Sequence, residues 1–142
     1  MTVTAVELST GTVGEAMSPG VLTCLPVTPL RVVARMMATH RVHSIVVFGA
    51  DDDVRPWGVI SDLDLVAAIG SAANAGGIAA SPVVTVTPEE TLTHAARLMA
   101  EHSTSHLLVV ASDTKLPIGV LSTLDIARAV AAEPGPDEFS DG

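Results

Sequence analysis

The apolar positions of this chain follow two different spacings. Short runs of aliphatic residues predict buried strands at residues 21–24, 44–48 and 57–60. Between the first two runs, the residue spacing predicts a helix on which Leu30, Val33, Met36, Met37 and His40 fall on one stripe. A second helix is expected over residues 61–69. The pattern therefore predicts the order strand, helix, strand, strand, helix.

The same order returns in the second part of the chain. Residues 21–47 align with residues 83–109 without a gap, and residues 56–64 align with residues 117–125 after the loss of one residue in the preceding turn. Each copy alone has too few strands and too little apolar surface to be stable. We therefore expect an α/β protein in which two β-α-β-β-α repeats pack face to face about a pseudo-twofold axis.

Local signals divide the chain further. Thr12 and Glu15 have the spacing of a helix capping box, and so do Thr87 and Glu90 in the second copy. A stretch rich in Gly, Ala and Asn separates the copies, and the last residues combine acidic groups with prolines. The expected divisions are an N-terminal segment at 1–11, a first repeat at 12–69, a linker at 70–77, a second repeat at 78–132 and a mobile acidic tail at 133–142.

Composition argues against several classes of function. The formal net charge is −9 and the chain has only seven Lys and Arg residues, which argues against a nucleic-acid partner. No segment has the pattern of a signal peptide or the length of a membrane span, so we expect a soluble cytoplasmic protein with no membrane contact. Cys24 falls in a predicted buried strand with no activating group beside it in the sequence. It is expected to be a small core residue, and the chain is not expected to be an enzyme.

Each repeat places a hydroxyl and a carboxylate at the start of its second helix. The sequence GVISDLD at residues 58–64 returns as GVLSTLD at residues 119–125. Ser-x-x-Asp is by itself a capping box, but the glycine in both copies predicts the close approach of another group. Helix N–H groups suit a phosphate, and a carboxylate can accept hydrogen bonds from the two hydroxyls of a sugar. The first candidate ligand-binding residues are Ser61, Asp64, Ser122 and Asp125.

These motifs resemble those of a tandem pair of cystathionine-beta-synthase (CBS) domains, also called a Bateman module, over residues 12–132. The resemblance implies that the hydroxyl and carboxylate contact the phosphate and ribose of an adenosine-type nucleotide, with an AMP-like ligand favoured, in the cleft between the repeats. It also implies a regulatory role, a homodimer and a separate effector protein. The first strand of each copy would then line the base, through Val21, Leu22, Thr23, Val83, Val84 and Thr85.

One feature of many nucleotide-binding relatives is missing. They carry a His-Arg pair where the second strand of a copy begins, directed at phosphates. Here the matching residues are His43 and Ser44 in the first copy and Ser105 and His106 in the second, so neither arginine is present. These four residues complete the predicted ligand-binding set. The lack of bidentate anchors favours a monophosphate or a nucleoside-like ligand over a polyphosphate.

Two other hypotheses remain open at this point. The first is a ligand-free CBS pair that uses its apolar helix faces for oligomerisation or for binding another protein. The second is a metal site, because His40 with His43 and His102 with His106 have spacings that metal ligands use. Histidines near helix ends can instead contact the terminal carbonyls. We therefore predict no metal site, and no cofactor apart from an adenosine nucleotide as regulatory ligand.

Overall fold

A computed structural model describes residues 11–49, 56–81 and 83–132 of the chain. The predicted N-terminal segment up to residue 10, the turn at 50–55 and the predicted tail at 133–142 lie outside the described residues. Among the helices of the described part, none combines the length and the apolar character that crossing a membrane requires.

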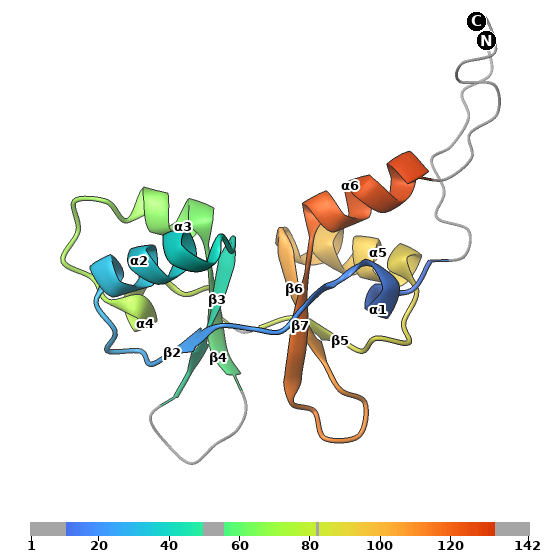
Figure 1. Ribbon diagram of the computed structural model, residues 1–142, viewed down its shortest axis with the longest axis horizontal. Coiled ribbons are helices and arrows are strands. Elements are labelled where there is room, and N and C mark those ends of the chain that lie inside the picture. The colour runs from blue at the N-terminus through green and yellow to red at the C-terminus, as the bar shows by residue number, and fades with distance from the viewer. Residues whose placement is uncertain (1–10, 50–55, 82, 133–142) are drawn as a thin grey trace, which may run out of the picture.

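The predicted order of elements is confirmed in two halves that lie side by side (Figure 1). The elements of the first half are β2 (Thr23–Cys24), α2 (Leu30–His40), β3 (Ser44–Phe48), β4 (Pro56–Ser61) and α3 (Asp62–Ala67). Those of the second half are β5 (Thr85–Val86), α5 (Leu92–His102), β6 (His106–Val110), β7 (Pro117–Ser122) and α6 (Thr123–Ala132).

The strands of each half form a small mixed sheet. In the first half β2 runs parallel to β3 and β3 antiparallel to β4, and β5, β6 and β7 repeat this arrangement in the second half. The strands of the two halves meet in the middle of the molecule and the helices lie on the outer sides (Figure 1). Val46, Leu108 and Val110 are buried together where the halves meet. Each half also has its own core between its sheet and its helices.

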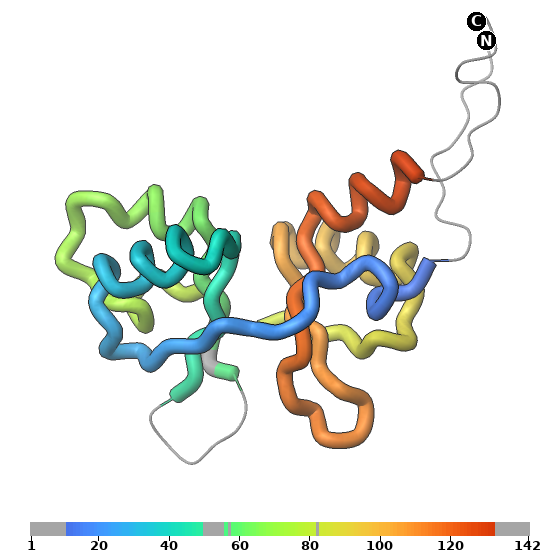
Figure 2. The backbone as a smooth tube through the Cα atoms, viewed as in Figure 1, coloured from blue at the N-terminus to red at the C-terminus, as the bar shows by residue number. Residues whose placement is uncertain are grey.

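The first described segment of the chain packs against the second half. Helix α1 (Val13–Ala16) contributes Val13 to the core of that half, and β1 (Ser18–Pro19) pairs antiparallel with β7. Figure 2 shows this segment beginning beside the second half and then crossing to the first. Helix α4 (Ala75–Ile78) makes the reciprocal contact, because Ala75 lies in the core of the first half. Part of the segment that we expected to be a linker is therefore helical, and the two halves exchange equivalent helical turns.

This exchange explains the repeated glycine of the GVISDLD and GVLSTLD motifs. A methyl group at Gly119 would lie 2.6 Å from the carbonyl oxygen of Ser18 and 2.9 Å from Sδ of Met17. A methyl group at Gly58 would lie 2.9 Å from the carbonyl oxygen of Ala80 and 2.9 Å from Cβ of Ala79. The prediction that another group approaches closely is correct, but that group is the exchanged backbone of the chain itself.

Two local predictions are wrong. The first strands pair over only two residues each, so residues 21–22 and 83–84 precede β2 and β5. Thr87 and Glu90 do form the predicted hydrogen bond, but it closes a turn and does not begin the helix. The N-cap of α5 is Thr91, whose hydroxyl accepts a hydrogen bond from the N–H of His94 at 3.1 Å. A Thr-x-x-Glu pattern closes a tight turn as readily as it caps a helix, because both leave backbone N–H groups in need of an acceptor.

Candidate functional site

Both predicted hydroxyl and carboxylate pairs form capping boxes. Asp64 Oδ2 accepts a hydrogen bond from the N–H of Ser61 at 2.8 Å, and Ser61 Oγ accepts one from the N–H of Asp64 at 3.1 Å. The corresponding distances at Ser122 and Asp125 are 2.8 Å and 3.2 Å, and the Ser122 hydroxyl also donates to Asp125 Oδ2 at 3.0 Å. Oδ2 of each aspartate therefore caps its helix, and Oδ1 is the oxygen left to accept further hydrogen bonds.

The surroundings of the two pairs differ. Asp125 is only 7% exposed, whereas Asp64 is half-buried. Asp125 Oδ1 lies 3.9 Å from Nη1 of Arg128, at the outer limit of an ion pair. A cavity of about 250 Å³, called the first cavity below, lies between the halves. Its wall combines Ser122 and Asp125 of the second half with Val21, Leu22, Arg41, His43 and Ser44 of the first half.

A larger cavity of about 540 Å³, called the second cavity, occupies the related position in the other half. Its wall includes Val83, Val84 and Thr85 together with the end of α5 at residues 102–104. His106 lines both cavities. Within the described part of the chain, Ser61 and Asp64 line neither of them. The pseudo-symmetry of the repeats therefore does not extend to the two carboxylates.

The first cavity thus joins residues that lie far apart in the sequence. The predicted residues in its wall are Val21, Leu22, His43, Ser44, His106, Ser122 and Asp125. Thr23 and Ser105, like Ser61 and Asp64, line neither cavity. The motif analysis missed Arg41, whose signal is its place between the end of α2 and the predicted contact residue His43.

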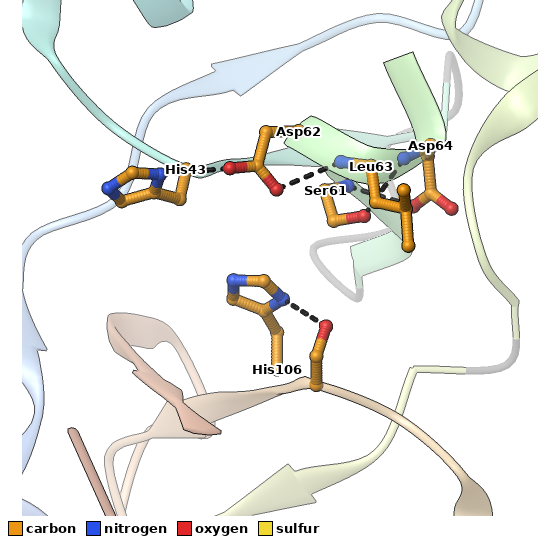
Figure 3. Close-up of polar contacts among 7 residues, drawn as sticks. His43, Ser61, Asp62, Leu63, Asp64 and His106 are labelled. Carbon is orange, nitrogen blue, oxygen red and sulfur yellow. Dashed lines mark hydrogen bonds and ion pairs between the residues drawn. The ribbon is translucent and has the colours of Figure 1, made fainter. Parts of the chain in front are cut away.

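One histidine of each half, His43 and His106, lines the first cavity (Figure 3). His43 Nδ1 lies 2.9 Å from Asp62 Oδ2, and this hydrogen bond is the main cause that holds the pKa of Asp62 below its ordinary value. His106 belongs to the other half, and its ring is directed toward the turn that carries Ser61 and Asp62. Burial lowers the pKa of His106, and this effect outweighs the nearby carboxylates of Asp62, Asp64 and Asp125. His106 is therefore neutral at pH 7 and can act as a hydrogen-bond donor or acceptor.

The described residues provide neither an activated cysteine nor a cluster of metal ligands. Burial raises the pKa of the Cys24 thiol and outweighs the opposite effect of the hydrogen bond with Thr28, so the thiol is protonated at neutral pH. In the three described ranges, no three His, Cys, Asp or Glu side chains converge in a way that could hold a metal ion.

The sequence model of the CBS domain family matches this chain twice, at residues 13–71 and 75–132. The chain belongs to the CBS domain family. An uncharacterized protein of Methanopyrus kandleri, MK0525, is 30% identical over 122 residues, which are 82% of this chain and 61% of that protein. The present CBS pair therefore spans less than two thirds of the length of this relative.

Solved structures of other CBS pairs have the same fold. The CBS domain pair of protein MJ0100, solved in complex with 5′-methylthioadenosine and S-adenosyl-L-methionine, has a TM-score of 0.74 and 21% identity, with 84% of this chain and 95% of that chain covered. The CBS domain protein PAE2072 from Pyrobaculum aerophilum, complexed with AMP, has a TM-score of 0.69 and 27% identity, with 86% and 99% covered.

Proposed function

We propose that this CBS pair is a regulatory module that binds an adenosine-type nucleotide, AMP or a similar ligand, in the first cavity and does not catalyse a reaction. The observation that carries the proposal is the composition of the cavity wall. Val21 and Leu22 of one repeat share it with Ser122 and Asp125 of the other. An aliphatic surface for a base and a carboxylate for a sugar are the two kinds of contact that a nucleoside needs.

The chemistry of the wall favours a small anionic ligand. The second oxygen of Asp125 would accept hydrogen bonds from the ribose hydroxyls, and charge-assisted bonds of this kind contribute about 1.5–3 kcal/mol each. The phosphate would lie toward Ser122, at the N-terminal end of the ten-residue helix α6. The volume of about 250 Å³ lies just below the usual range for ligand pockets, which favours one phosphate over three. The complex of PAE2072 with AMP supports this choice of ligand.

A regulatory role needs a second protein or a change in self-association. A ligand can shift such an equilibrium only by the difference between its affinities for the two states. His106 physically links the two cavities, because it lines both of them and lies where the two halves meet. The proposal includes a cytoplasmic homodimer and a separate effector protein that responds to nucleotide binding.

Titration calorimetry with AMP tests the proposal, with Asp125→Asn and Asp64→Asn as a matched pair. Both substitutions keep an oxygen that can cap the helix, but only Asp125 lines the first cavity. We expect Asp125→Asn to weaken AMP binding about tenfold or more, and Asp64→Asn to change it by less than about twofold. Equal losses in the two variants would contradict the assignment of the cavity. Wild-type protein that gives no heat of binding and no rise in Tm with AMP would contradict the function.

A second candidate is a ligand-free module for protein interaction, and one surface favours it. Leu63 and Val66 on α3, together with Ile69 just after it, are 73%, 61% and 78% exposed. Leu63 and Val66 share one face of α3 and Ile69 lies just past its end, and such exposed apolar groups mark contact surfaces. Sedimentation velocity of Leu63→Asp, with Leu116→Asp in the β6–β7 turn as control, tests this surface. Loss of self-association in the first variant alone, in a protein that AMP does not stabilise, would support this second function.

A further inference from the structure

The wall of the first cavity contains an arginine that none of the repeated motifs includes. Arg41 follows the last residue of α2, and its N–H donates to the carbonyl oxygen of Met37. Its backbone has left-handed angles, with φ 53° and ψ 46°. This conformation turns the chain from α2 toward β3, so Arg41 enters the cavity wall beside His43.

The local fold does not require an arginine at this position. A cation at a helix C-terminus interacts favourably with the helix dipole, so Arg41 could have a purely structural role. The other half provides the comparison, because Ser103 follows α5 with φ 50° and ψ 43° and lines the second cavity. The same backbone turn is therefore made with a short neutral side chain. The turn therefore does not require an arginine, and the two cavities differ in having Arg41 or Ser103 in the wall.

Arg41 is also the one permanent cation in the wall of either described cavity. Within the described ranges no carboxylate lies at ion-pair distance from its guanidinium, whereas Asp62 is engaged by His43. His106 supplies no charge at neutral pH, since its burial favours the neutral ring. Arg41 is exposed, lines the first cavity and has no carboxylate partner among the described residues, so in a chain of net charge −9 its guanidinium is available to an anionic group.

We propose that Arg41 binds the phosphate of the nucleotide in the first cavity and replaces the arginine that is missing after His43. The first cavity then selects a nucleoside monophosphate. The second cavity has Ser103 in the same place, so its wall lacks this cationic side chain. This inference rests on the proposed function and deepens it, because it names the residue that distinguishes AMP from adenosine.

Titration calorimetry with AMP and with adenosine separates the contribution of the phosphate. The variants are Arg41→Ser, which copies the residue of the second half, Arg41→Lys, which keeps the charge, and Arg35→Ser. Arg35 is exposed on α2, lines neither cavity and controls for the lost charge. We expect Arg41→Ser to bind AMP about tenfold more weakly while its adenosine affinity changes by less than about twofold. Arg41→Lys should recover part of the loss, and Arg35→Ser should resemble the wild type.

The outcomes distinguish the inference from the function on which it rests. If the wild type binds AMP and adenosine equally tightly, or if Arg41→Ser weakens both ligands by the same factor, Arg41 is not a phosphate anchor although the cavity still binds nucleosides. An equal loss of AMP affinity in Arg35→Ser would assign the effect to overall charge and would also overturn the inference. If neither ligand binds to the wild type, the proposed function itself fails.

Discussion

The N-termini of α3 and α6 in this CBS pair have the same sequence pattern but different surroundings. Each has a serine and an aspartate that hold the first helical turn through the same pair of hydrogen bonds. Asp125 is buried and lines the first cavity together with Val21 and Leu22 of the opposite half, whereas Asp64 is half-buried and lines neither cavity. The motif determines the local hydrogen bonds, whereas the packing of the halves determines which carboxylate lines the first cavity.

The exchanged segments account for part of this difference. In the second half β1 adds a paired strand beside β7, and α1 packs near α6, which extends over residues 123–132. In the first half the equivalent contact is a single bridge between Val59 and Ala80, and α3 ends at Ala67. The longer helix and the added strand surround Asp125 more completely than Asp64.

The largest effect on stability is expected when the closest of these backbone contacts is broken. Gly119→Ala would place a methyl group 2.6 Å from the Ser18 oxygen, where only movement of the backbone can relieve the overlap. We expect the free energy of unfolding to fall by about 1–3 kcal/mol, with a smaller loss for Gly58→Ala. Urea unfolding measures both. Gly49→Ala is the control, because nothing lies within 4 Å of its added methyl group. Equal stability of Gly119→Ala and the control would contradict the exchanged packing.

Removing the capping hydroxyl at the N-terminus of α3 or of α6 allows a direct comparison of the two sites. Ser61→Ala and Ser122→Ala should each lower the free energy of unfolding by about 1 kcal/mol, because each leaves a helix N–H without its acceptor. Thermal unfolding checks this similarity. Calorimetry with AMP should then separate the variants, since only Ser122 lines the first cavity. An effect of Ser61→Ala on AMP affinity as large as that of Ser122→Ala would remove the distinction between the halves.

The smallest expected effect concerns pH. His106 has no titrating equivalent in the first half, where the aligned residue is Ser44. Its pKa in the folded protein lies below the ordinary value of 6.5, so between these two values the unfolded chain binds a proton that the folded protein does not. Stability is therefore lost as the pH falls from 6.5 toward the folded pKa.

His106→Gln should flatten this part of the stability profile, measured by urea unfolding between pH 7 and pH 5. The contribution of Asp62 falls in a separate window, because its lowered pKa affects stability only near and below its ordinary value of 3.8. His40→Gln, which removes an exposed histidine from the end of α2, is the control. The same flattening in the control, or none in His106→Gln, would contradict the effect of burial on His106.

Much of the fold could be predicted because the relevant signals are local or repeated. The aliphatic runs at residues 44–48 and 57–60 fall in β3 and β4, and the stripe of Leu30 and Val33 lies on α2. The exchange of α1 and α4 could not be predicted in this way. Nothing in residues 13–16 or 75–78 indicates which core will receive Val13 or Ala75, because either core offers an apolar surface.

The sequence by itself determined the duplication, the order of strands and helices within each repeat, the two Ser-x-x-Asp capping boxes and membership of the CBS family. These properties depend on residue spacing and on hydrogen bonds within a few residues. Only the tertiary structure decided that Asp125 and not Asp64 lines the first cavity, that Arg41 lies beside His43 in its wall, and that the repeated glycines make room for backbone. Those outcomes depend on contacts between segments far apart in the chain, whose geometry is set when the two halves pack.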